Sequence, residues 1–214
     1  MEGVEQFRRA WDAPDHPDNR TPVEIYRTPV GNLNSTGLLG NYEGPALSRW
    51  HPQFQSSLEP GVQQLVQAMV EKLDLVTYTC CEGHRYPGSR FGPVERHVGV
   101  LPRNHAEEAL VLSTLERVAA TARRRAPRRG VVLAPISGVL LDGRHSYPVV
   151  DLFFHRKRWS SWAAYFKHLP THYAAAVNAI AIIAQEEKRA GQKPTEASSR
   201  RTVAHRVQPK ISRD

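Results

Sequence analysis

The chain has 214 residues, of which 40% are hydrophobic, and its formal net charge is +8 at pH 7. This length suits one domain with extensions, and the positive charge favours anionic partners, either a small molecule or RNA. The two cysteines are adjacent, at positions 80 and 81, which excludes a secreted domain built on disulfides.

No apolar stretch reaches the roughly 18 residues that a membrane span requires. The N-terminal residues do not combine a basic region with an apolar run, as a secretory signal does. We therefore expect a cytoplasmic protein that does not bind membranes. The residues indicate no particular oligomeric state.

Residues 1–58 are expected to form an irregular arm rich in proline and glycine, with one short strand at Val23–Tyr26. A core domain is expected over residues 59–190. Its first helix begins after Pro60, because several apolar residues share one helical face; they are Val62, Leu65, Val66, Met69 and Leu73. Residues 191–214 are polar and basic, which predicts a disordered tail.

Two strands are predicted next, at Val76–Cys81 and at His97–Leu101, separated by a long loop of glycine and proline. A helix then begins with a capping box, in which Asn104 is the N-cap and Glu107 the third helical residue. It is expected to end near Arg125, where three arginines suit the negative end of the helix dipole.

Val131–Leu141 and Tyr147–Phe154 are predicted to be two further strands. Asp142 and Gly143 indicate a turn between them, with a loop longer than two residues. The last helix is expected to begin near Trp159 and to be interrupted at Pro170. Because the strands arrive in pairs, the sequence predicts an α+β fold with a mixed or mostly antiparallel sheet and helices packed on it.

The most concentrated chemistry lies where a strand enters a glycine loop, with Cys81 and His84 spaced as C-x-x-H. In one interpretation these residues are half of a zinc ligand set. Two more ligands would then come from the remaining donors, which are His97, Asp142, His145, Asp151 and His155. Asp151 and His155 lie roughly 13 Å apart along an extended strand, so they would not share one ion.

In a second interpretation, His84 lowers the pKa of a neighbouring thiol and acts as its base. In a third, the loop binds an anion. Gly83 would adopt a positive φ that lets backbone N–H groups converge, and Arg85 and Arg90 would make bidentate contacts.

Two residues outside this loop are expected to belong to the same pocket. His97 opens the next strand, and consecutive strands usually lie side by side. Asp151 stands in an apolar run and needs a partner, for which a nearby arginine or histidine is expected.

The run Leu75–Arg85 resembles the signature of the tRNA wybutosine-synthesising protein 3 family, in which a helix leads to a strand that ends in T-x-S-S-C-S-G-R. A later strand of that family opens with histidine and valine, as His97 and Val98 do here, and the similarity covers about residues 60–155. Cys80 and Glu82 replace serines of the pattern, and His84 intervenes before Arg85. The resemblance implies an S-adenosylmethionine-dependent transferase acting on a modified guanosine in tRNA, with Cys81, Gly83 and His97 as pocket residues.

The sequence therefore predicts an enzyme that acts on a nucleotide-like or RNA-linked anionic substrate, with group transfer from S-adenosylmethionine as the leading reaction. Its catalytic residues would be Cys81, Glu82 and His84, and its substrate-binding residues Thr79, Gly83, Arg85, Arg90, His97 and Asp151. No residue is assigned as a metal ligand in this interpretation. The alternatives are a non-catalytic module that binds RNA or a small ligand, and a zinc-dependent hydrolase that uses Cys81 and His84.

Overall fold

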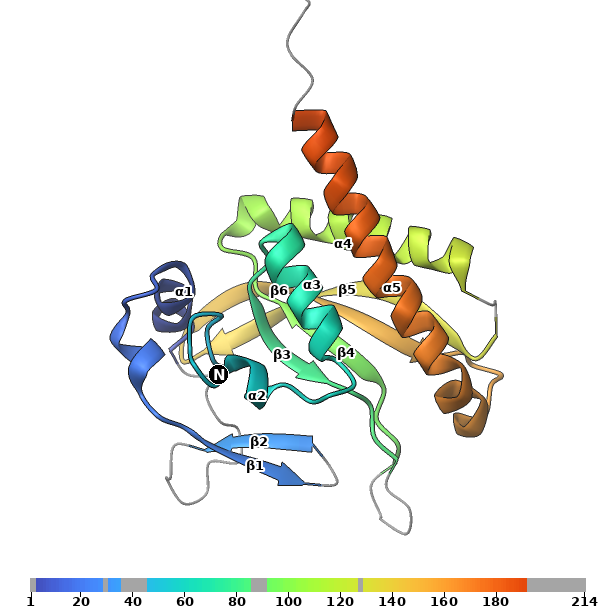
Figure 1. The fold of residues 1–214 in the computed structure, drawn as a ribbon, viewed down its shortest axis with the longest axis horizontal. Coiled ribbons are helices and arrows are strands. Elements are labelled where there is room, and N and C mark those ends of the chain that lie inside the picture. The colour runs from blue at the N-terminus through green and yellow to red at the C-terminus, as the bar shows by residue number, and fades with distance from the viewer. Residues whose placement is uncertain (1–2, 29–30, 36–45, 86–91, 127–128, 192–214) are drawn as a thin grey trace, which may run out of the picture.

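A computed structural model describes residues 3–28, 31–35, 46–85, 92–126 and 129–191 (Figure 1). Its centre is a four-stranded antiparallel sheet with the strand order β3-β4-β6-β5. The strands are β3 Thr77–Cys81, β4 Arg96–Val100, β5 Val131–Asp142 and β6 His145–Arg156. The α+β fold with an antiparallel sheet, which the paired strands predicted, is confirmed.

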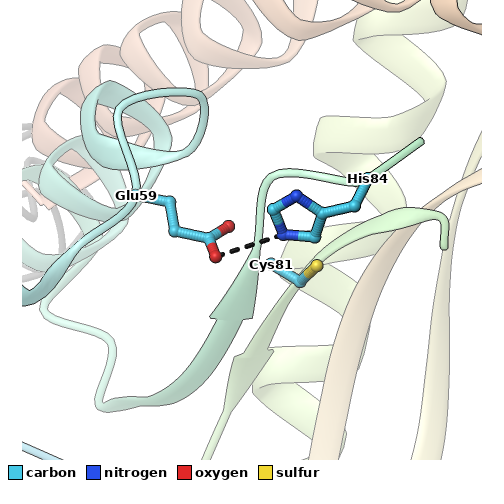
Figure 2. A group of neighbouring side chains, drawn as sticks. All are labelled: Glu59, Cys81 and His84. Carbon is cyan, nitrogen blue, oxygen red and sulfur yellow. Dashed lines mark hydrogen bonds and ion pairs between the residues drawn. The ribbon is translucent and has the colours of Figure 1, made fainter. Parts of the chain in front are cut away.

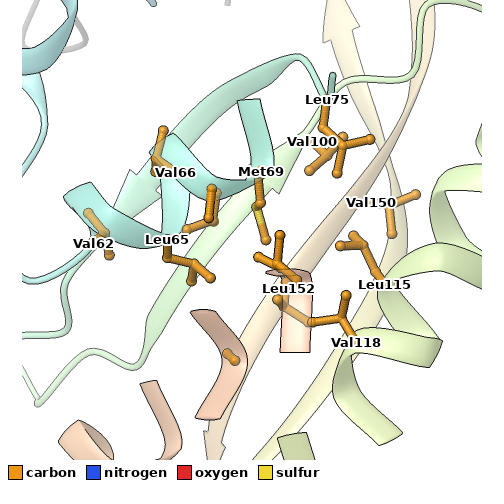
Figure 3. Packing of buried hydrophobic residues seen from close by; sticks show 14 of the residues in the cluster. Val62, Leu65, Val66, Met69, Leu75, Val100, Leu115, Val118, Val150 and Leu152 are labelled. Carbon is orange, nitrogen blue, oxygen red and sulfur yellow. The ribbon is translucent and has the colours of Figure 1, made fainter. Parts of the chain in front are cut away.

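Three helices pack on one face of this sheet and on one another (Figure 1). They are α3 Gln63–Leu73, α4 His105–Arg125 and α5 Trp162–Gly191. Figure 3 shows Met69 of α3 and Leu115 of α4 meeting Leu152 of β6, and all three side chains are fully buried. Burial of each such side chain contributes about 1.5–3 kcal/mol. The predicted cap of α4 is confirmed, because the Asn104 side chain accepts a hydrogen bond of 3.0 Å from the Glu107 N–H.

The connection between β5 and β6 is shorter than predicted. Asp142 pairs directly with His145, which leaves only Gly143 and Arg144 in the turn. Gly143 has a φ of 58°, and a positive φ at the first of two turn residues is the pattern of the type II′ hairpin, which matches the twist of the strands. The expected longer loop was wrong, since the strand pairing continues to the last residue before the turn.

Helix α5 continues through Pro170 instead of breaking there. The proline lies on the exposed side of the helix, where water satisfies the carbonyl that loses its intrahelical partner. The buried face stays in the core both before the proline, at Leu169, and after it, at Ala175. Among the described residues, no helix is both long and apolar enough to cross a bilayer.

The N-terminal segment holds more regular structure than the strand expected at Val23–Tyr26. It contains α1 Val4–Asp12, the 3-10 helix η1 Pro17–Arg20, the antiparallel pair β1 Glu24–Thr28 and β2 Gly31–Ser35, and α2 Phe54–Ser57. Helix α1 buries Phe7 and Trp11, and the N–H groups of Gly3 and Val4 donate to the Asp142 carboxylate at 3.0 and 2.9 Å. This anion at the helix N-terminus fastens α1 to the β5–β6 hairpin. The predicted tail beyond Gly191 lies outside the described residues.

Trp11 is fully buried and contacts Phe7 and Phe54 edge-on. We expect Trp11→Ala to lower the free energy of unfolding by about 3–5 kcal/mol, because it leaves a large cavity in the core. Trp159, which is 90% exposed, provides the matched control, and Trp159→Ala should cost less than about 0.5 kcal/mol. Equal urea midpoints for the two variants would show that α1 is not part of the folded core.

Candidate metal centre

Helix α3 and strand β3 run in opposite directions and have nearly the same length. The helix has 11 residues and the strand five, so each spans about 16 Å. Asp74, in the left-handed conformation at the C-cap of α3, reverses the chain between them. The residues just before α3 therefore return to the residues just after β3, and Glu59 lies beside the loop that contains His84.

The Glu59 carboxylate is buried and has a partner on each oxygen. Its Oε2 accepts a hydrogen bond of 2.6 Å from the Glu82 N–H, and its Oε1 lies 3.2 Å from His84 Nε2. Glu59 and His84 are each only 7% exposed. A carboxylate at this depth is retained only where such partners replace water.

The Cys81 thiol is the third member of this cluster. The donor atoms of Glu59, Cys81 and His84 all lie within 4.8 Å of one another. Figure 2 shows the carboxylate facing the imidazole, with the Cys81 side chain beside the ring. Oxygen, nitrogen and sulfur donors in one place are typical of zinc, and three protein ligands leave a fourth position open, as in catalytic zinc sites.

Both thiols are held in their protonated form by their surroundings. Burial is the main cause that raises the pKa of Cys81 to about 11. The carboxylates of Glu59 and Glu82 also raise this pKa, whereas the hydrogen bond from the Gly83 N–H and the charge of Arg96 lower it. Burial and then Glu59 raise the pKa of Cys80 to about 12. A neutral thiol is a weak nucleophile, so this setting disfavours a nucleophilic cysteine that works without a cation.

The two cysteines lie on opposite faces of β3. Cys80 is paired with Val98, which is fully buried beneath the helices, and it packs against the hydrophobic core. Cys81 is paired with His97 on the other face, and both cysteines keep partial exposure. Cys81 is therefore the half-buried member of the cluster, whereas Glu59 and His84 are buried.

Gly83 has a φ of 80°, so the positive φ predicted for it is confirmed. A Cβ at this position would lie 3.0 Å from the Arg96 nitrogen and 3.2 Å from the Val94 carbonyl oxygen. Its N–H approaches Cys81 Sγ at 3.4 Å, whereas the sequence predicted that it would help to bind an anion. The glycine thus permits the tight turn that brings His84 back over Cys81.

Arg96 and Glu82 brace this turn. Arg96 Nε donates to the Glu82 carbonyl at 2.7 Å, and its guanidinium lies 4.8 Å from the centre of the Tyr173 ring of α5. The Glu82 carboxylate accepts a hydrogen bond of 2.7 Å from the Gly61 N–H. Glu82, predicted to be catalytic, therefore also joins the loop before α3 to the end of β3.

The predicted substrate-binding residues fall into separate places. The exposed Arg85 has its guanidinium 4.8 Å from the centre of the Phe166 ring in α5, and Arg90 lies outside the described residues. His97 stacks on Phe153 with the ring centres 5.0 Å apart. Thr79 is paired with Gly99 on the neighbouring strand.

Asp151 belongs to a second cluster, next to His97. Its partner is a tyrosine instead of the arginine or histidine that was expected, because the Tyr78 hydroxyl donates to its carboxylate at 3.0 Å. Burial raises the pKa of Asp151, and Tyr78 and then His97 oppose this shift. Thr79 and Asp151 both crowd the space that a side chain would need at Gly99.

The additional metal donors named from the sequence do not join Cys81 and His84. Asp142 binds the N-terminus of α1, and His155 Nδ1 lies 2.7 Å from a Glu95 oxygen. Within the described residues, Glu59 completes the cluster instead. Sequence reasoning missed Glu59, although the similar lengths of the helix and strand that follow it were a signal that it returns to Cys81.

Comparisons of the chain with models of protein families, with curated proteins and with solved structures find no match. The resemblance noted over residues 60–155 therefore stays a prediction.

The raised pKa of Cys81 predicts slow alkylation of the metal-free protein. In Cys80→Ala protein treated with a chelator, iodoacetamide should react with Cys81 at pH 8 at least about tenfold more slowly than in the urea-unfolded chain. The rate should climb as the pH approaches the pKa of about 11. A rate that equals the unfolded value, or that levels off below pH 9, would contradict the proposed environment.

Proposed function

We propose that this protein is a zinc-dependent hydrolase that acts on an anionic substrate, with Glu59, Cys81 and His84 as the zinc ligands. The observation that carries the proposal is the convergence of their three donor atoms within 4.8 Å. Each donor is of a type that zinc prefers, and the set leaves one position open.

The electrostatics of the cluster support a bound cation. A Cys81 thiolate beside the Glu59 carboxylate would place two negative charges together in a partly buried site, which is unfavourable without a counter-charge. A divalent ion balances those two charges, and a coordinated thiol loses its proton at neutral pH. The same surroundings that disfavour a free thiolate therefore suit a metal thiolate.

The neighbouring backbone is arranged to hold the ligands in place. The Glu82 N–H fixes the Glu59 oxygen that does not face His84, and the Gly83 N–H points at the Cys81 sulfur. Hydrogen bonds to ligand atoms of this kind orient them toward a metal and tune its affinity.

Bound zinc lowers the pKa of a water molecule and polarises an electrophilic centre, which is the chemistry of hydrolysis. A protein base would take a proton from the water as its oxygen bonds to that centre, and the base would pass this proton to the leaving group as the bond to that group breaks. Glu82 is the nearby carboxylate for this base, since it follows Cys81 and its carboxylate lies 2.7 Å from the Gly61 N–H, close to Glu59 in the chain. The net charge of +8 favours an anionic substrate.

Elemental analysis of purified protein tests the metal site. We expect about one zinc ion per chain in the unaltered protein and in Cys80→Ala, the control that changes the adjacent cysteine on the other face. Cys81→Ala and Glu59→Gln should raise the zinc dissociation constant by at least about 100-fold, because loss of a ligand costs more than loss of an outer-shell partner. Circular dichroism establishes that each variant is folded.

A chromogenic ester or phosphodiester panel tests the reaction on the same preparations. Turnover should disappear with a chelator and with Cys81→Ala, and return when zinc is restored to the unaltered protein. Zinc-free protein with full activity, or Cys81→Ala protein that holds as much zinc as Cys80→Ala, would refute the proposal. S-adenosylmethionine found in the native protein by mass spectrometry would favour the predicted transferase instead.

A further inference from the structure

Two stretches of the core domain contain no acidic residue and carry much of the positive charge of the chain. Residues 117–141 and 152–185 lack aspartate and glutamate, yet together they hold ten lysines and arginines. The whole chain has a net charge of +8, so the rest of it has fewer basic than acidic residues. Such segregation indicates a surface for an anionic partner.

The fold brings these two stretches together at one end of the molecule. The C-terminal end of α4, the start of β5, the end of β6 and the start of α5 lie at the right of Figure 1. The Lys157 N–H donates to the Gly130 carbonyl at 3.0 Å, and Gly130 lies against Ala164 and His168 of α5. We call this region the basic end; its exposed cations are Arg123, Arg124, Arg125, Arg129, Arg158 and Lys167.

The exposed cations of the basic end form no ion pair with any carboxylate in the part of the chain that the structure describes. Some arginines elsewhere are neutralised: Arg103 contacts three carboxylates, and Arg117, in the middle of α4, pairs with Glu186 and Glu187. Glu95, which lies beside the end of β6, already accepts from His155 and from the Arg156 N–H. The positive charges of the basic end are therefore available to bind an anionic ligand.

An exposed aromatic ring lies beside one of these cations. Trp159 is 90% exposed, and the Arg158 guanidinium lies 5.1 Å from the centre of its ring. Its neighbour Trp162 instead packs against Tyr165 and Phe166. An indole left in water beside cations is the arrangement that proteins use to stack an unpaired base while neighbouring arginines bind phosphates.

We propose that the basic end binds single-stranded nucleic acid, with a base stacked on Trp159 and the phosphate backbone held by the arginines at the end of α4 and by Arg158. A membrane surface fits less well, since Trp159 is the single large apolar side chain that is strongly exposed among the described residues of this end. This proposal does not depend on the zinc site, because the two share no residue.

Fluorescence anisotropy with a labelled single-stranded oligonucleotide of mixed sequence tests the proposal on the full chain. Trp159→Ala should weaken binding about five- to fifty-fold, as loss of one stacked base does. The double variant Arg123→Ser, Arg124→Ser should weaken it further and should lower the slope of log affinity against log salt by about 0.7 for each phosphate that is no longer neutralised. Arg144→Ser, at the distant β5–β6 turn, removes one positive charge away from the basic end and, as the control, should leave the affinity unchanged.

Tryptophan emission gives a second reading of the same event. The oligonucleotide should quench the contribution of Trp159 to the emission, both in the unaltered protein and in Trp50→Phe. This quenching should be absent in Trp159→Ala. The proposal would be overturned if Trp159→Ala and the double arginine variant both bound the oligonucleotide with the same affinity as Arg144→Ser. Binding to vesicles rich in anionic lipid without binding to the oligonucleotide would overturn it as well. Cys81→Ala protein should keep its affinity for the oligonucleotide. Nucleic-acid binding and zinc binding can therefore fail independently of each other.

Discussion

The arrangement around the candidate metal centre depends on one buried carboxylate. Glu59 is 7% exposed, and its two oxygens are directed at the Glu82 N–H and at the His84 imidazole. A carboxylate cannot stay at this depth without such partners, so the loop before α3 and the loop after β3 have to meet. That meeting also places the carboxylate beside the Cys81 thiol, and it explains why Gly83 adopts a conformation that other residues rarely take.

The first turns of α5 contact both the loop of the candidate metal centre and the basic end. On one side, the Tyr165 hydroxyl accepts from the Arg96 N–H at 2.8 Å and Phe166 lies under Arg85, so this helix supports the loop of the metal centre. On another, its residues Ala164 and His168 pack against Gly130 at the basic end. The proposed nucleic-acid site and the proposed zinc site are thus joined through one helix.

Much of this architecture follows from local patterns in the sequence. The apolar face of α3, the β-branched residues of β3 and the cap at Asn104 are short-range signals, and they predicted the elements that carry Cys81 and His84. Other features depend on contacts that no local pattern contains. Helix α1 has only nine residues and is stabilised by docking on Asp142, Pro170 is tolerated because its side of α5 faces water, and Glu59 reaches the site only because α3 and β3 match in length.

X-ray absorption at the zinc edge of the purified protein tests the central claim most directly, because it reports the atoms that surround the ion. The geometry predicts one sulfur at about 2.3 Å, together with nitrogen and oxygen neighbours at about 2.0–2.2 Å. The sulfur contribution should persist in Cys80→Ala protein, in which Cys81 is the remaining thiol. A first shell of nitrogen and oxygen without sulfur would contradict the assignment of Glu59, Cys81 and His84 as the ligands.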